Sequence, residues 1–193
     1  MKVRESGMPE EGIWTSFFTP DAILDELGLT GNMRDAVDLG CGYGTFAIPA
    51  AKRIQGTLHG FDVEPDMIEA SRRFAEQQDV GNVRLYLRDF MADGTGLPDT
   101  SVDYVMLYNI LHAEDPVGLL SEAFRILHDD GGIAGIMHWN YDPETPRGPP
   151  MDIRPSPEQC VHWAESAGFI IERRHVELPP YHYGIVAKKG TRR

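Results

Sequence analysis

Short apolar runs alternate along the chain with longer segments in which apolar residues recur at helical spacing. The first run, at 36–39, reads Ala-Val-Asp-Leu and stops at glycine, which is typical of a buried strand. The same reasoning predicts further strands at 58–63, 83–87, 102–107 and 133–137. Helical spacing and proline at first turns predict intervening helices at 43–54, 65–78, 116–127 and 157–167. The pattern therefore indicates strands and helices in strict alternation.

Such alternation predicts an α/β fold with a mostly parallel sheet and helices on both of its faces. The end of the chain breaks the rule, because two strands at 169–176 and 183–187 are joined by a short segment containing Pro179-Pro180. A short connection makes a hairpin, so the last of the seven expected strands runs antiparallel to its neighbours.

The segment ahead of the first strand is predicted to hold one or two helices. Trp14, Phe18, Ile23 and Leu27 give it a large apolar surface to bury. We therefore divide the chain into an N-terminal helical segment at 1–30, which could act as a lid, and a domain at 31–193. A long proline-rich stretch at 143–157 is interpreted as a loop within that domain.

The composition of the 193-residue chain is that of an ordinary globular protein, with 41% hydrophobic and 25% charged residues. The net charge of −12 argues against a nucleic-acid partner, since phosphate binding rests on clustered Lys and Arg. No apolar run approaches the ~20 residues of a membrane span. The start of the chain lacks the apolar core of a signal peptide. These features predict a cytoplasmic protein without a membrane partner.

The most informative segment is a glycine-rich turn between the first strand and the first core helix. It reads Asp38-Leu39-Gly40-Cys41-Gly42-Tyr43-Gly44, and its glycines allow a ligand to approach the main chain. Asp62 ends the second strand, where a carboxylate can accept both hydroxyls of a ribose. Asp89 ends the third strand and could accept from an adenine amino group, with Phe90 covering the ring. All three acids fall at the ligand-binding edge of an open α/β sheet.

Taken together, these motifs resemble those of class I S-adenosylmethionine-dependent methyltransferases. The stretch 37–44 is similar to the first motif of that family, and 60–63 with Met67 is similar to the second. Residues 88–90 and 97–105 look like the third and fourth motifs, and 109–112 looks like the acceptor-side strand end. The resemblance covers about 34–189 and is closest to the small single-domain enzymes that act on small molecules. It implies a Rossmann-like, doubly wound sheet whose last strand is antiparallel.

The resemblance also implies a cofactor, S-adenosylmethionine, whose product is S-adenosylhomocysteine. Gly40 and Gly42 would border its methionine part, with Asp38 near the amino group, and Asp62 would hold the ribose. The full set of cofactor contacts expected from it is Asp38, Gly40, Gly42, Gly44, Asp62, Val63, Met67, Asp89, Phe90, Asn109 and Ile110.

Methyl transfer from a sulfonium requires positioning and exclusion of water, and a base only where the acceptor must lose a proton. His112 follows the fourth strand, and His138 and Tyr141 follow the fifth, so these three are the candidate catalytic residues. The remaining histidines are scattered without metal-ligand spacing. We therefore expect no metal.

Two arginines stand out in the proline-rich loop of this acidic chain. Arg147 or Arg154 is expected to bind an anionic group on the acceptor, because guanidinium pairs well with carboxylate and phosphate. Trp14 and Phe18 are expected to contact the substrate by closing over the site and excluding water.

Three other functions are weighed against small-molecule methyl transfer. A nicotinamide-dependent oxidoreductase would use the same sheet edge, but Thr45 stands where a dinucleotide motif has its third glycine. A protein that binds S-adenosylmethionine without catalysis fits the same motifs. A nucleic-acid methyltransferase is disfavoured by the charge and by the sequence Tyr108-Asn109-Ile110-Leu111 after the fourth strand. A protein acceptor stays open, and a monomer and a homodimer are both compatible with the sequence.

Overall fold

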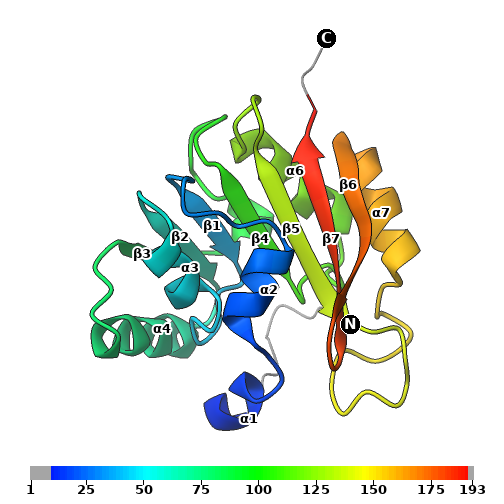
Figure 1. Ribbon diagram of the computed structural model, residues 1–193, viewed down its shortest axis with the longest axis horizontal. Helices are drawn as coiled ribbons and strands as arrows, with labels where there is room; N and C mark the ends of the chain where they lie inside the picture. The colour runs from blue at the N-terminus through cyan, green and yellow to red at the C-terminus, as the bar shows by residue number, and fades with distance from the viewer. Residues whose placement is uncertain (1–9, 191–193) are drawn as a thin grey trace.

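The computed structural model describes residues 10–190 and contains one seven-stranded sheet with helices on both faces (Figure 1). Its strands are β1 (Ala36–Leu39), β2 (Leu58–Asp62), β3 (Val83–Leu87), β4 (Tyr104–Tyr108), β5 (Ile133–Trp139), β6 (Phe169–Leu178) and β7 (His182–Lys189). Its helices are α1 (Glu11–Thr15), α2 (Pro20–Glu26), α3 (Ala47–Arg53), α4 (Pro65–Gln77), α5 (Phe90–Asp93), α6 (Pro116–Ile126) and α7 (Pro157–Ser166).

The strand order across the sheet is β3-β2-β1-β4-β5-β7-β6. Every pairing from β3 to β5 is parallel, whereas β7 pairs antiparallel with both β5 and β6. The predicted Rossmann-like fold, with seven strands and an antiparallel last strand, is confirmed. The strand order reverses between β1 and β4, and a crevice opens at such a point beyond the carboxyl ends of the strands.

Two apolar layers hold the sheet between its helices. On one face α2, α3 and α4 cover a cluster that includes Leu24, Ala50 and Met106, and these helices lie on the near side in Figure 1. On the other face α6 and α7 cover a cluster that includes Leu107 and Leu120. All four residues of β1 are buried, as expected for a central strand covered on both sides.

Several helices begin where the sequence places their first turn. Pro65, Pro116 and Pro157 occupy the first helical position, where the missing N–H has no intrahelical partner to lose. α7 also carries a capping box, in which the Ser156 hydroxyl accepts from Gln159 N and the Gln159 side chain accepts from Ser156 N.

The first core helix is shorter than the sequence pattern predicts. It begins at Ala47 rather than at 43, because the glycine-rich segment continues as an irregular turn up to Phe46. This shift places Pro49 at the third helical position. The first helical N–H groups have no intrahelical acceptor, so the proline costs little there.

The strands at the end of the sheet are longer than predicted. β5 extends to Trp139, so His138 and Trp139 lie within this strand instead of following it. Antiparallel pairing with β7 causes the extension, because His138 pairs with Tyr183 and Trp139 with His182. The short helix α5 was not predicted, and it is capped by the side chain of Asp89.

The N-terminal elements attach to the sheet unequally. Leu24 and Leu27 at the end of α2 are fully buried in the core, whereas α1 has no buried residue. α1 lies at the edge of the sheet where the parallel strands end, and the loop at 140–154 hangs from that same edge (Figure 1). The residues that the structure describes include no helix long and apolar enough to cross a membrane.

Candidate active site

A cavity of about 490 Å³ opens at the carboxyl ends of the parallel strands. It lies where the strand order reverses, which is the position expected for a ligand in this architecture. Of the residues singled out from the sequence, its walls contain Trp14, Gly40, Gly42, Asp62, Val63, Asp89, Phe90, Asn109, Ile110, His112 and Arg147. Residues that are distant in the sequence therefore meet around one space.

The glycine turn forms the floor of this cavity. Gly40 has φ +81°, and a Cβ atom there would come to 2.9 Å from Cδ1 of Ile110, which also lines the cavity. Gly44 has the same φ but a different role. A Cβ at that position would meet the Ser71 hydroxyl at 3.0 Å and Ile48 at 3.1 Å. Gly40 thus leaves room for a ligand beside Ile110, whereas Gly44 lets the turn pack against α4.

Asp62 connects the glycine turn to the end of β2. Its Oδ2 atom accepts from Gly42 N at 2.9 Å, and its Oδ1 atom accepts from Glu64 N at 3.0 Å. Burial raises the pKa of this carboxyl, while the two main-chain hydrogen bonds act in the opposite direction. The carboxylate is therefore fixed in place at the cavity wall.

Asp38 lies nearby but is not part of the wall. Its side chain is 3% exposed, and burial, followed by the charge of Asp62, raises its pKa to about 7. The carboxyl therefore changes its charge near neutral pH. A cation bound beside it would favour the ionised form and lower this pKa.

Asp89 and Phe90 line the side of the cavity that follows β3. The Asp89 Oδ1 atom accepts from Ala92 N at 3.1 Å and so caps α5. Phe90 is buried in the core, with its ring 6.4 Å from that of Phe61. The two residues therefore have structural roles in addition to the ligand contacts predicted for them.

Asn109 provides the clearest sign that a polar ligand belongs in the cavity. Its backbone is left-handed, with φ +55°. Both its Oδ1 and its Nδ2 atoms are buried and have no hydrogen-bond partner in the described part of the chain. Buried amides in native proteins are nearly always hydrogen-bonded. Because Asn109 lines the cavity, a bound ligand can supply the missing partners.

The two predicted catalytic histidines meet, but only one reaches the cavity. His112 lines the wall, and its Nδ1 atom lies 3.3 Å from Nε2 of His138, which is fully buried and does not line the cavity. Burial lowers the pKa of both rings, strongly in the case of His138. Tyr141 is 54% exposed and is also absent from the cavity wall.

The two arginines of the proline-rich loop have different surroundings. Arg147 lines the cavity beside Gly148, Pro149 and Pro150. Arg154 is 7% exposed and does not line it. Its guanidinium donates to four main-chain carbonyls and to one hydroxyl, which belong to Asn140, Asp142, Arg147, Pro149 and Thr145. Arg154 therefore organises the loop and is not free to pair with an anionic acceptor.

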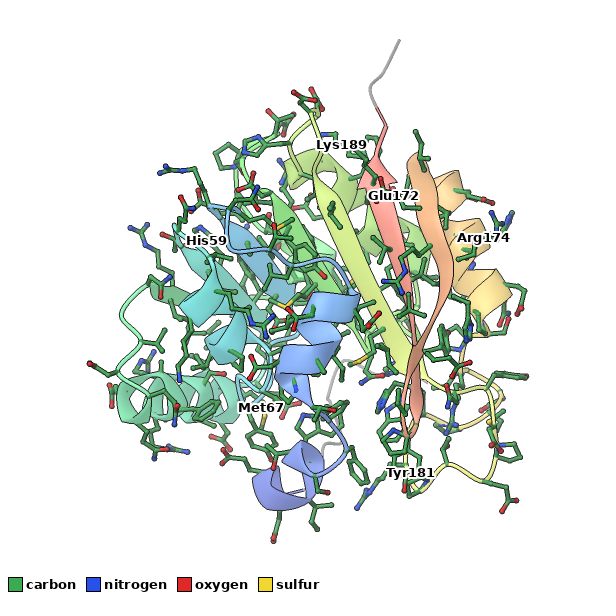
Figure 2. All side chains as sticks on the ribbon, viewed as in Figure 1. His59, Met67, Glu172, Arg174, Tyr181 and Lys189 are labelled. Carbon is green, nitrogen blue, oxygen red and sulfur yellow. The ribbon has the colours of Figure 1, made fainter. Side chains whose placement is uncertain are left out.

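The aromatic residues before β1 also divide between two roles. Trp14 lines the cavity and is partly exposed. Phe18 is buried against Phe46 and His182, with ring centroids 5.2 Å and 4.8 Å away, and does not reach the cavity. The neighbouring Tyr181 lies at the β6–β7 turn, at the same end of the sheet as α1 (Figure 2). Phe18 thus anchors the segment that carries Trp14.

Met67 does not line the cavity either; it lies in the first turn of α4, at the lower end of the molecule in Figure 2. Sequence reasoning missed several residues that do line it, namely Glu64, Met91, Tyr108, Glu114, Asp115, Pro149, Pro150 and Ile153. Tyr108 follows the strand predicted at 102–107, and the structure makes it the last residue of β4. Glu64, Glu114 and Asp115 directly follow predicted strand-end residues, so extending those motifs by a few positions would have found them.

The glycine turn, the carboxylates after β2 and β3 and the unpartnered amide of Asn109 together define a nucleotide-cofactor site on a doubly wound α/β sheet. A family model described as a methyltransferase domain matches residues 36–131. The chain belongs to the class I S-adenosylmethionine-dependent methyltransferases.

Individual relatives agree with this assignment. Aklanonic acid methyltransferase DauC of Streptomyces sp. (strain C5) is 34% identical over 134 residues, which cover 67% of this chain and 60% of DauC. This chain therefore spans less than two thirds of the length of that relative. Among solved structures, a SAM-dependent methyltransferase from Aquifex aeolicus has a TM-score of 0.79 and 25% identity, and 90% of each chain is covered. The [4+2]-cyclase SpnF shares the fold, with a TM-score of 0.75 at 17% identity.

The cofactor of this family is S-adenosylmethionine, and the cavity fits it. Asn109 offers a buried donor and a buried acceptor without partners, and Gly40 keeps a space open that a Cβ atom would fill. Asp62 presents a fixed carboxylate, which is the group that holds ribose hydroxyls in nucleotide sites.

Proposed function

We propose that this chain transfers a methyl group from S-adenosylmethionine to a small acceptor that carries an anionic group. The observation that carries the proposal is the division of the cavity wall. One part holds the glycine turn with Asp62 and Asp89, and another holds His112, Arg147 and apolar rings. A cofactor and a second molecule can therefore lie side by side in one space.

The cofactor would lie against the first of these parts. Asp62 would accept from the ribose hydroxyls, and Asp89 would accept from the adenine amino group beside Phe90 and Val63. Asp38 would act from below as the counter-charge of the methionine ammonium group. Asn109 and Ile110 would contact the cofactor from the end of β4, with Gly40 and Gly42 beneath it.

Apolar groups form the part of the wall assigned to the acceptor. Trp14, Trp139, Pro149, Pro150 and Ile153 line it, and these side chains suit a molecule with a flat, apolar body. Arg154 fixes the loop that contributes three of them. The acceptor is therefore proposed to be a small molecule and not a nucleic acid.

Arg147 is proposed to bind the anionic group of the acceptor. Among the described residues that line the cavity it is the only Lys or Arg, and its guanidinium has no hydrogen bond or ion pair with any of the described residues. An unpartnered guanidinium in a chain of net charge −12 favours a carboxylate or phosphate ligand. The name of the relative DauC, an aklanonic acid methyltransferase, is consistent with an acidic acceptor.

His112 is proposed as the general base. Burial lowers its pKa, so its ring is neutral at pH 7 and able to take a proton from the acceptor. When bound, S-adenosylmethionine would supply a methyl group on a sulfonium, and its sulfur would keep the electron pair of the C–S bond as the acceptor took the methyl group. The surrounding rings exclude water from the acceptor, and Arg147 keeps the reacting atom in line.

The alternative reading is a protein that binds the cofactor without transferring its methyl group. The [4+2]-cyclase SpnF, which shares the fold and is named for a different activity, supports this alternative. The two functions differ in turnover and not in cofactor binding.

We further propose that the protein is cytoplasmic and forms a monomer or a homodimer. Gel filtration with light scattering would distinguish the two oligomeric states.

The test combines binding and turnover. Calorimetric titration with S-adenosylmethionine, S-adenosylhomocysteine and NAD should show binding of the first two only. S-adenosylhomocysteine release should then appear with at least one member of a panel of hydroxylated aromatic carboxylates, such as 4-hydroxybenzoate, and fall at least tenfold in His112→Ala. Binding of NAD alone would overturn the cofactor assignment. Cofactor binding with no turnover across a broad panel would favour the non-catalytic alternative.

A further inference from the structure

Two histidines lie one behind the other at the cavity wall. His112 follows β4 and lines the cavity, whereas His138 lies within β5 and is fully buried. Their rings are nearly perpendicular, at 83°, and the His112 Nδ1 atom lies 3.3 Å from the His138 Nε2 atom. His138 can therefore act on a bound molecule only through His112.

Two ring nitrogens at this distance share one proton, because each neutral imidazole carries a single N–H. The position of that proton decides what His112 presents to the cavity. If His112 donates from Nδ1, its Nε2 atom keeps a free lone pair. If His138 donates from Nε2, the His112 Nε2 atom carries a hydrogen and cannot act as a base.

The proposed base role of His112 requires the first arrangement, because only then does its Nε2 atom keep a lone pair. His138 then accepts at Nε2 and carries its own proton at Nδ1. That Nδ1 atom is buried and has no hydrogen-bond partner among the described residues, so the contact with His112 is the hydrogen bond that holds the His138 ring.

Burial is the main reason that the His138 ring stays neutral. It lowers the pKa of His138 well below the ordinary value, and His112, His182 and Arg154 act in the same direction. His182 is itself neutral near pH 7, since burial lowers its pKa to about 3. His138 is thus a neutral hydrogen-bond acceptor and not a base in its own right.

We propose that His138 is a positioning residue, which accepts the Nδ1–H of His112 and so presents the His112 Nε2 lone pair to the cavity. The inference rests on the proposed function, in which His112 is the base. It also narrows the acceptor class to molecules that lose a proton on methylation. In that step the proton moves to the His112 Nε2 atom, and the resulting imidazolium keeps its Nδ1–H bond to His138.

Nitrogen-15 NMR of the full chain, labelled at histidine, tests this directly, because ring nitrogen shifts distinguish the two neutral tautomers. The signals of His112 are identified by their loss in His112→Gln. In the unsubstituted protein, His112 should be in the Nδ1–H form near pH 7. In His138→Phe it should shift toward the Nε2–H form. His138→Gln, whose side-chain oxygen can accept, should restore the Nδ1–H form.

A matched control is His182→Gln, which changes a buried histidine close to His138 that has no hydrogen bond to His112. It should leave the His112 tautomer unchanged. An Nε2–H form in the unsubstituted protein would overturn the proposal. So would an unchanged tautomer in a His138→Phe variant that still binds S-adenosylmethionine. Should His138→Phe not fold, the unsubstituted protein and His138→Gln decide the question.

Failure of the proposed function would look different. If His112→Ala turned over as fast as the unsubstituted enzyme, the base assignment would fail, whatever tautomer His112 adopts. If His112→Ala abolished turnover while the unsubstituted protein showed the Nε2–H form, only the role of His138 would fail.

Discussion

The two parts of the cavity wall are built in different ways. The cofactor part is made from short segments directly after β1, β2 and β3, and main-chain hydrogen bonds within and between those segments fix its carboxylates. The acceptor part is made from α1, the end of β5 and a long loop, and one buried arginine holds that loop together. The first part depends on local geometry, and the second depends on contacts between distant segments.

This difference has a functional consequence. A site built from short turns on a rigid sheet suits a cofactor that never changes. A site built from a long loop and an N-terminal helix can vary without disturbing the sheet. Substitutions in the cofactor part should therefore change the affinity for S-adenosylmethionine, whereas substitutions in the acceptor part should change KM for the acceptor.

The largest effect is expected from Asp62→Ala. The substitution removes a fixed carboxylate that accepts from Gly42 N and Glu64 N and that is proposed to hold the ribose hydroxyls. Charged hydrogen bonds contribute about 1.5–3 kcal/mol each, so the affinity for S-adenosylmethionine should fall by about 100-fold. Calorimetric titration measures this, with Glu69→Ala on the exposed face of α4 as a control that should bind normally.

Arg154→Met should affect stability and the acceptor together. It removes five hydrogen bonds to the loop and leaves carbonyls without donors, so the free energy of unfolding should fall by about 3 kcal/mol. Denaturant titration measures the stability, and steady-state kinetics should show a raised KM for the acceptor. Unchanged stability and an unchanged KM would show that the loop does not need this arginine.

The sequence predicted much of the wall assigned to the cofactor, although Met67, which was also expected there, does not line the cavity. A glycine turn after a buried strand and acids at consecutive strand ends place Gly40, Asp62 and Asp89 at one edge through topology alone. The sequence did not reveal which arginine of the loop is buried. That depends on where a long chain segment folds back, and Arg147 and Arg154 look alike in a proline-rich stretch.

The sequence also did not predict that His138 would be buried. His138 was predicted to follow a strand and face the acceptor, but antiparallel pairing with β7 carries β5 through Trp139 and encloses His138. The length of an apolar run in the sequence does not predict how far pairing with a neighbouring strand will extend the strand. Phe18 and Trp14 are similar in chemistry, and only the packing against Phe46 and His182 separates their roles.

The affinity for the cofactor should depend on pH through the ionisation of Asp38. Burial raises its pKa to about 7, so in the free protein it is protonated below that pH and ionised above it. The ionised form attracts the cofactor's ammonium group, so affinity for S-adenosylmethionine should rise by about tenfold between pH 6 and pH 8. Asp38→Asn should bind more weakly and without this dependence. Titration calorimetry in buffers of different ionisation enthalpy should also detect proton release on binding.

The same carboxyl affects stability in the opposite direction. Because the folded pKa of Asp38 lies above its ordinary value of 3.8, the folded state holds a proton that the unfolded state releases between about pH 4 and pH 7. Stability should fall as pH rises through that window. In Asp38→Asn, which stays neutral, this component of the fall should be absent in urea titrations at several pH values.

Trp14→Ala should have the smallest effect. Trp14 lies on a helix with no buried residue, and its ring contacts Phe18 at 4.8 Å between centroids. If it covers the acceptor, as proposed, KM for the acceptor should rise by about threefold to tenfold with little loss of stability. The matched control Phe18→Ala removes a buried side chain, so it should lower the free energy of unfolding by about 3 kcal/mol.

The central claim is that the two parts of the cavity act independently, and Arg147→Leu tests it most directly beside Asp62→Ala. For each variant, the Kd of S-adenosylmethionine is measured by calorimetry, and KM is measured with the acceptor identified in the panel. Arg147→Leu should raise KM for the acceptor about tenfold and leave the cofactor Kd within twofold, since a charged hydrogen bond contributes about 1.5–3 kcal/mol. Loss of cofactor affinity in Arg147→Leu, with an unchanged KM for the acceptor, would contradict the account.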